Sequence, residues 1–158
     1  MADRKALHVR GRGLPDGEPV EWWIVDGGLS AEPIADAETV FDGGWIIPGL
    51  VDAHCHVGLG PRGPIEMDEA AEQAETERAA GALLLRDAGS PTDTRRFDDR
   101  HDLPRIIRAG RHLARPKRYV RGFAVELEDE WQLPDAVAEQ ARFGDGWVKL
   151  VGDWIDRE

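Results

Sequence analysis

Two histidines separated by one residue are the clearest candidates for chemistry in this sequence. His54 and His56 flank Cys55 and follow the mostly apolar run 50–53. In a β-strand, residues i and i+2 face the same side, so both imidazoles are predicted to point together while Cys55 points away. Two neighbouring imidazoles form half of a chelate for a divalent metal. The alternative is a pair of half-exposed loop histidines, because this spacing also arises by chance.

Lys149 is the second candidate, because it lies in the middle of the apolar run 147–151 (WVKLV). A buried lysine is costly, so one explanation is an edge strand from which the lysine stem reaches water. The other is an amine of lowered pKa that reacts with CO₂ to form a carbamate. A carbamate is an anionic, carboxylate-like ligand that can bridge two metal ions. The residue alone does not decide between the two.

Alternating strand and helix signals surround these residues. Strands are predicted at residues 49–54, 82–87 and 147–151, a third strand or mixed segment at 105–113, and helices at 67–80 and 135–142. Strand–helix units repeated at intervals of about 30 residues are typical of a parallel sheet. Residues 49–158 would then form the first half of a (β/α)8 barrel, with His54 and His56 at the strand ends where barrel active sites lie. The alternative is a compact α+β domain with an antiparallel sheet.

The N-terminal residues 1–48 have a different pattern, with short strands separated by turns. β-rich runs cover residues 7–10, 20–25, 39–42 and 45–47. Residues 26–28 (DGG) are a turn signal, and Gly43-Gly44 separates the last two runs. We expect a small antiparallel sheet that is too thin to be a whole domain.

Composition and charge exclude several classes of protein. The formal charge of −11 argues against nucleic acid or an anionic membrane as the main partner. No apolar run approaches the ~20 residues that cross a bilayer, and the first ten residues lack the apolar stretch of a signal peptide. The single cysteine excludes an internal disulfide framework and fits a reducing compartment. We expect a soluble cytoplasmic protein.

Three segments resemble the amidohydrolase superfamily. Residues 46–56 (IIPGLVDAHCH) are similar to its metal-binding signature. Residues 85–89 (LRDAG) resemble the second-strand segment of its imidazolonepropionase-like and prolidase-like branch, and residues 146–150 (GWVKL) resemble the fourth-strand segment that carries a carboxylated lysine. The resemblance implies an α/β fold in which β-sandwich strands, residues 1–48, precede the first half of a (β/α)8 TIM-type barrel, residues 49–158.

The resemblance also implies an activity for the complete protein. It is that of a hydrolase of C–N bonds, in an amide, a cyclic amide or a dipeptide, which uses water activated by one or two divalent metal ions, commonly zinc. His54 and His56 would bind the more buried ion, and a carboxylated Lys149 would bridge the two. The other ligands of the family, two histidines and a proton-shuttling aspartate, belong to later strands that we expect downstream of this chain, so no residue here is assigned as the catalytic base.

A rival interpretation is a truncated, non-catalytic fragment or binding module that retains the two histidines. For residues 1–158 alone we expect no activity as a monomer, because half a barrel leaves unpaired strand edges. Self-association, a partner that carries the missing half-barrel, or a longer polypeptide of which residues 1–158 are a part would cover those edges, and we expect the longer polypeptide. For the complete protein we expect a small-molecule substrate.

A few further side chains lie near the candidate site in the sequence. Asp52 is predicted on the same face of the strand as the two histidines and could orient them without binding the metal itself. The alternative is a role in packing or in a turn. Arg86 and Asp87, at the end of a predicted strand, are expected to form a structural ion pair. His101 and His112 lack metal-ligand spacing and are expected at the surface.

Overall fold

The computed structural model describes residues 5–118, 120 and 122–152. Contacts between Cα atoms divide the chain into two compact units, Met1–Pro48 and Gly49–Glu158. Together they make a mixed α/β protein with several small sheets. No helix in the described residues is both long and apolar enough to cross a membrane.

The N-terminal unit is built on one four-stranded sheet with the order β3-β2-β1-β4. Its strands are β1 (Leu7–Gly13), β2 (Pro19–Val25), β3 (Gly28–Ser30) and β4 (Glu38–Ile46). The expected turn after β2 is present, with positive φ at Asp26 and Gly27, the conformation of a tight two-residue hairpin turn.

This sheet differs in two ways from the antiparallel sheet predicted by the sequence. β4 runs parallel to β1, because residues 31–37 return the chain before β4 begins. The runs 39–42 and 45–47 belong to one strand through Ile46 and not to two. Gly43 and Gly44 adopt positive φ within β4, and the pairing with β1 shifts register nearby, so the glycines form an irregularity in a continuous strand.

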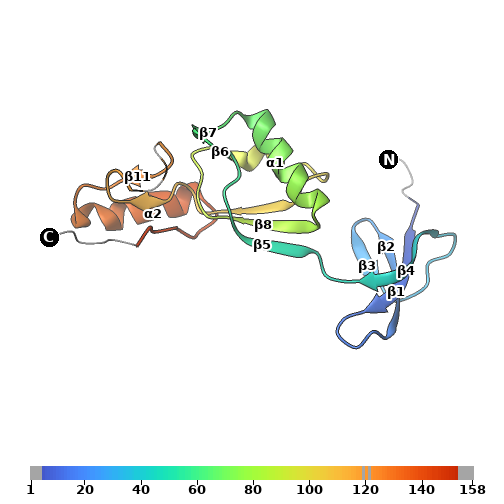
Figure 1. The fold of residues 1–158 in the computed structure, drawn as a ribbon. Coiled ribbons are helices and arrows are strands. Elements are labelled where there is room, and N and C mark those ends of the chain that lie inside the picture. Colours follow the sequence, from blue (N-terminus) through green and yellow to red (C-terminus); the bar gives the residue numbers. More distant parts are fainter. Residues whose placement is uncertain (1–4, 119, 121, 153–158) are drawn as a thin grey trace. The chain divides into compact units, whose positions relative to one another are not determined.

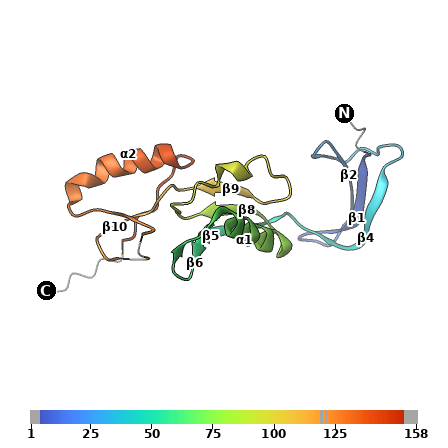
Figure 2. The ribbon, with the colours of Figure 1, turned by 90° about the horizontal axis from the view of Figure 1, so that it is seen from above.

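The C-terminal unit contains a parallel sheet that carries the candidate histidines. Its strands are β5 (Leu50–Cys55), β8 (Ala82–Asp87) and β9 (Arg105–Arg108), in the order β5-β8-β9. A short hairpin, β6 (Leu59–Gly60) and β7 (Gly63–Pro64), follows β5. Helix α1 (Met67–Ala79) then leads to β8, and Figures 1 and 2 show it lying over the sheet.

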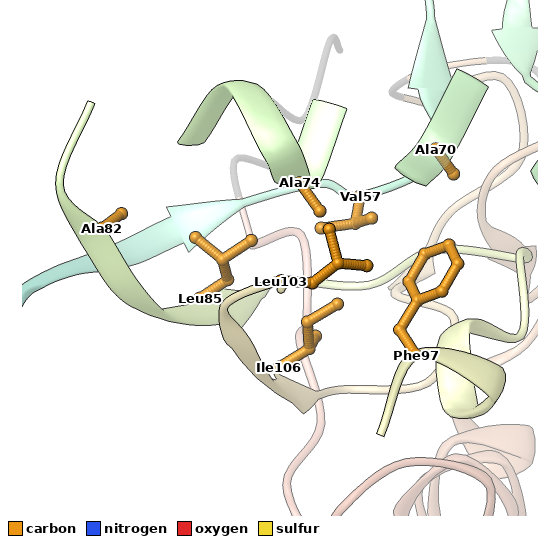
Figure 3. Packing of buried hydrophobic residues seen from close by; sticks show 8 residues of the cluster. All are labelled: Val57, Ala70, Ala74, Ala82, Leu85, Phe97, Leu103 and Ile106. Carbon is orange, nitrogen blue, oxygen red and sulfur yellow. The ribbon is translucent and has the colours of Figure 1, made fainter. Parts of the chain in front are cut away.

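The main core of this unit lies between α1 and the parallel sheet. Figure 3 shows Ala74 of α1 beside Val57 and Leu103, with Ala70 on the side of Phe97, and Leu85 of β8 and Ile106 of β9 belong to the same cluster. The 3-10 helix η1 (Thr94–Phe97) adds Phe97 to the same cluster. Small alanines on the helix allow close approach to the sheet, and the branched side chains of the strands fill the space.

The last part of the unit holds helix α2 and short parallel pairings. β10 (Leu113–Ala114) pairs with β11 (Val125–Glu126), and η2 (Glu130–Gln132) leads into α2 (Leu133–Phe143). Residues 105–113, predicted as a strand or a mixed segment, are mixed, because Gly110 has φ +70° and turns the chain between β9 and β10.

The fourth strand predicted at residues 147–151 is not a regular strand. Leu150 forms one isolated parallel bridge with Leu113. The Leu113 N–H donates to the Lys149 carbonyl, and the Val151 N–H donates to the Leu113 carbonyl, both at 2.9 Å. The extended direction was predicted correctly, but the neighbour is only the two-residue β10, which limits the pairing to a single bridge.

Candidate metal centre

The carboxyl end of β5 brings the two histidine rings together. His54 lies in the strand and His56 just beyond its end, with ring centroids 5.6 Å apart. Asp52 accepts a hydrogen bond from the His54 backbone N–H at 2.9 Å through its carboxylate. Asp52 therefore holds the backbone of the histidine segment. This is the turn role that the sequence offered as the alternative to supporting the metal-binding histidines.

Cys55 points away from the histidines into the core between sheet and helix. It packs against the cluster that contains Leu85 and Ala74. Burial, the largest cause, raises the pKa of its thiol to about 12, with Asp87 and Asp52 adding to the effect. The side chain is a neutral thiol at physiological pH and does not act as a thiolate ligand.

The His56 ring is held in a defined orientation by a backbone carbonyl. Its Nδ1 lies 2.8 Å from the carbonyl oxygen of Gly89, in the loop after β8. A carbonyl only accepts hydrogen bonds, so Nδ1 carries the proton and Nε2 retains its lone pair. Burial is the largest cause that lowers the pKa of His56, which favours the neutral ring that a metal requires.

Lys149 reaches the same place from residues distant in sequence. Its Nζ lies 3.3 Å from Nε2 of His54, and the side chain is partly buried. The backbone hydrogen bond from Leu113 to the Lys149 carbonyl fixes the segment from which it projects. The structure thus gathers His54, His56 and Lys149 into one group at the end of the parallel sheet.

His112 is a neighbour of the site that sequence reasoning placed wrongly. It was expected at the surface, but it is fully buried, with its ring centroid 6.0 Å from that of His56 and 5.7 Å from that of Phe123. Burial lowers its pKa to about 4, so the ring is neutral at pH 7. The apolar pair Leu113-Ala114 next to His112 could have indicated its burial. The prediction considered only the spacing between possible metal ligands.

Arg86 and Asp87 do not form the expected ion pair. The Arg86 guanidinium lies over the Trp147 ring, 4.2 Å from its centroid. Asp87 turns inward, where its carboxylate accepts the Gly89 N–H at 2.8 Å. Because successive side chains on a strand face opposite sides of the sheet, the two neighbours cannot pair easily.

The donor set fits a divalent metal in chemistry but is incomplete by itself. Two imidazoles and a lysine that can become anionic are suitable ligands for zinc. In the described part of the chain, however, no group of three or more His, Cys, Asp or Glu side chains is placed to hold a metal ion. His54, His56 and Lys149 alone do not make up the four ligands of a structural zinc site.

Comparisons with known proteins place the chain within longer relatives. No family model matches the chain. Uncharacterized proteins of Mycobacterium bovis and Mycobacterium tuberculosis are 78% identical to it over 152 residues, a match that covers 96% of this chain but 41% of each relative. The chain thus spans about 41% of the length of the curated relatives that it matches.

Solved structures share the fold. An amidohydrolase matches with a TM-score of 0.68 and 22% identity, over 92% of this chain and 46% of that one. A prolidase complexed with N-methylphosphonate-L-proline matches with a TM-score of 0.62 and 18% identity, over 92% and 46% of the two chains. The A. niger ochratoxinase matches with a TM-score of 0.61 and 17% identity, over 93% and 46%. The predicted resemblance is confirmed in the fold, which is that of part of the amidohydrolase structures.

Proposed function

We propose that this chain supplies the first metal ligands of a metal-dependent hydrolase that cleaves C–N bonds. The observation that carries the proposal is the meeting of His54, His56 and Lys149 at the carboxyl end of the parallel strands. Active sites of parallel barrels lie at this end. Residues 1–48 would be strands of a composite β-sandwich and residues 49–158 the first half of a TIM-type barrel.

His54 and His56 would hold one divalent ion, zinc, through ring nitrogens. The Gly89 carbonyl already fixes the tautomer of His56 that leaves Nε2 available. Lys149 would hold the ion as a carbamate: its neutral Nζ attacks the carbon of CO₂, an N–C bond forms and Nζ releases a proton. A bound metal would lower the pKa of a water ligand and polarise the scissile carbonyl.

The names of the fold relatives support a proposal for the substrate class. Their names describe an amidohydrolase and a prolidase, the latter complexed with a phosphonate analogue that contains proline. We infer an amide, a cyclic amide or a dipeptide as the substrate of the complete protein, and a general base supplied from outside the described residues.

The second candidate is a non-catalytic module that retains the two histidines. One observation favours it: the described residues do not gather three metal-binding His, Cys, Asp or Glu side chains. Metal binding and hydrolysis by the intact protein separate the two functions.

The test uses the intact protein with His54→Asn/His56→Asn and Lys149→Met variants. Wild type should retain zinc through gel filtration and hydrolyse members of a panel of N-acyl amino acids and dipeptides, and a chelator should abolish hydrolysis. The double variant should lose the metal and Lys149→Met should lose activity, whereas His101→Asn, at an exposed histidine, should change neither. A wild type that binds zinc without hydrolysing any substrate would support the binding module, and one that binds no zinc would overturn the proposal.

A further inference from the structure

The loops that follow β5 and β8 are joined around one buried carboxylate. Asp87, the last residue of β8, is 2% exposed, and its Oδ1 accepts the Gly89 N–H at 2.8 Å. The backbone N–H of Val57, the residue after His56, also acts on this carboxylate and lowers its pKa. Two backbone donors from two different loops therefore converge on Asp87.

The Gly89 backbone is fixed on both sides of this contact. The Ala88 N–H donates to the Cys55 carbonyl at 2.8 Å, and the Ser90 N–H donates to the Gly110 carbonyl at 2.9 Å. Gly89 has φ +114°, and a Cβ there would lie 2.8 Å from the His112 backbone nitrogen. The position admits only glycine, so its carbonyl has little freedom to turn away from His56.

These contacts form a closed path around His56. The ring donates through Nδ1 to the Gly89 carbonyl, the Gly89 N–H donates to Asp87, and the Val57 N–H, next to His56 in the chain, also acts on Asp87. Loss of the carboxylate would release the acceptor of the ring and the backbone that carries the ring at the same time.

We propose that Asp87 is a positioning residue that sets the tautomer and the orientation of His56 through Gly89 and Val57. This inference rests on the proposed function, because the orientation of His56 matters only if His56 binds a metal. The contacts between Asp87, Gly89 and His56 do not depend on a metal. A metal-binding histidine gains affinity when its second nitrogen is held by a fixed acceptor, because the ring then requires no reorientation on binding. Asp87 acts on His56 through backbone groups of the two loops.

A merely structural Asp87 would stabilise the loops without affecting the state of the His56 ring. Asp145 provides a matched control, because its carboxylate also accepts a backbone N–H, that of Arg108 at 2.7 Å, yet it holds the end of β9 and not the His56 loop. Asp87→Asn and Asp145→Asn each replace one acceptor oxygen by an amide donor with almost no change in volume.

The experiment measures the metal-free and zinc-loaded states of the intact protein separately. In the metal-free protein at a pH at which His56 is neutral, ¹⁵N NMR of the ring, assigned with a His56→Gln variant, reports the tautomer. Wild type and Asp145→Asn should show Nδ1–H as the dominant form, whereas Asp87→Asn should show a mixture. The zinc Kd from competition with a chelator should increase about tenfold in Asp87→Asn and remain unchanged in Asp145→Asn.

The outcomes separate this inference from the proposed function. A wild-type tautomer and an unchanged zinc Kd in a folded Asp87→Asn protein would overturn the role of Asp87. A wild type that binds no zinc would overturn the metal site, and the NMR comparison would still test positioning. Should Asp87→Asn fail to fold, Asp87→Ser in the same NMR comparison keeps a smaller acceptor, and a wild-type tautomer there would also count against the inference.

Discussion

At the scale of single residues, Gly89 is a position where a small change should be costly. A Cβ at residue 89 would lie 2.8 Å from the backbone nitrogen of His112 and 3.1 Å from the carbonyl oxygen of Gly110, at a φ of +114°. Neither neighbour is the end of a flexible side chain, so the backbone itself would have to move. Gly89→Ala should lower the free energy of unfolding by about 2 kcal/mol or more, measured by urea denaturation.

Gly146 provides the control for backbone strain alone. Its φ is +90°, but a Cβ there would meet no atom within 4 Å. Gly146→Ala should therefore cost only the left-handed conformation, roughly 1 kcal/mol. If the two variants lose the same unfolding free energy, the backbone around residue 89 moves away from the new Cβ without a further cost in stability.

Asp87 should make stability depend on pH in an unusual direction. Burial, opposed by the N–H donors of Gly89 and Val57, raises its pKa to about 6. An unfolded aspartate titrates near 3.9, so between these values the folded state binds the extra proton. The free energy of unfolding should therefore increase as the pH falls from 6 towards 4, and this gain is lost as the pH rises through 6.

Comparison with Asp87→Asn isolates that contribution, because the amide does not titrate. The unfolding free energy of wild type minus that of the variant should increase by about 1–3 kcal/mol between pH 7 and pH 4.5. Urea titrations at several pH values measure the difference. A difference that stays constant with pH would contradict the raised pKa.

The sequence predicted some residue positions correctly because they depend on local geometry. Strand alternation suffices to place His54 and His56 together and Cys55 in the core. The burial of His112 and the inward turn of Asp87 depend on contacts between loops that are distant in sequence. No spacing rule contains those contacts, which explains why the location of His112 and the ion pair of Asp87 with Arg86 were predicted wrongly.

At the scale of elements, Gln73 joins α1 to the loop that follows the histidines. Its side-chain oxygen accepts the Gly58 N–H at 2.9 Å, and its side-chain nitrogen donates to the Leu59 carbonyl at 2.8 Å. Gln73→Met keeps the volume but leaves both backbone groups without these partners. We expect a loss of about 2 kcal/mol in stability and faster hydrogen exchange at the Gly58 amide.

Glu69→Met tests whether the effect belongs to this contact. Glu69 is exposed on the same helix, so its replacement should leave exchange at Gly58 unchanged and stability within about 0.5 kcal/mol. If the Gly58 amide exchanges at the same rate in wild type and in Gln73→Met, the β6–β7 hairpin and not Gln73 holds the loop.

Elements with a complete local signal were predicted more accurately than those that require a partner. Helix α1 was expected at residues 67–80 and spans Met67–Ala79, because its start and its alanine-rich interior are encoded locally. Residues 147–151 have a strand-like composition but form a single bridge, because a strand also requires a long neighbour. The parallel direction of β4 likewise depends on where residues 31–37 lead, which composition does not specify.

At the scale of the whole molecule, the parallel sheet ends in two edges. The order β5-β8-β9 makes β5 and β9 the outer strands. Val51 of β5 and Leu83 of β8 are 56% and 52% exposed, which is high for strands of a parallel sheet. In relatives of which this chain spans 41%, the additional residues are available to cover such a surface.

Residues 1–158 expressed alone should therefore self-associate despite the net charge of −11. Light scattering should give a mass above the 17.5 kDa of one chain that increases with protein concentration, and a hydrophobic dye should bind. Val51→Lys/Leu83→Lys should shift the mass towards one chain, because charged side chains in place of these exposed apolar ones oppose their burial between copies. Glu69→Lys, a comparable change on the exposed side of α1, should leave the mass unchanged. A wild-type chain that stays monomeric at all concentrations and binds no dye would show that these exposed apolar side chains do not drive association.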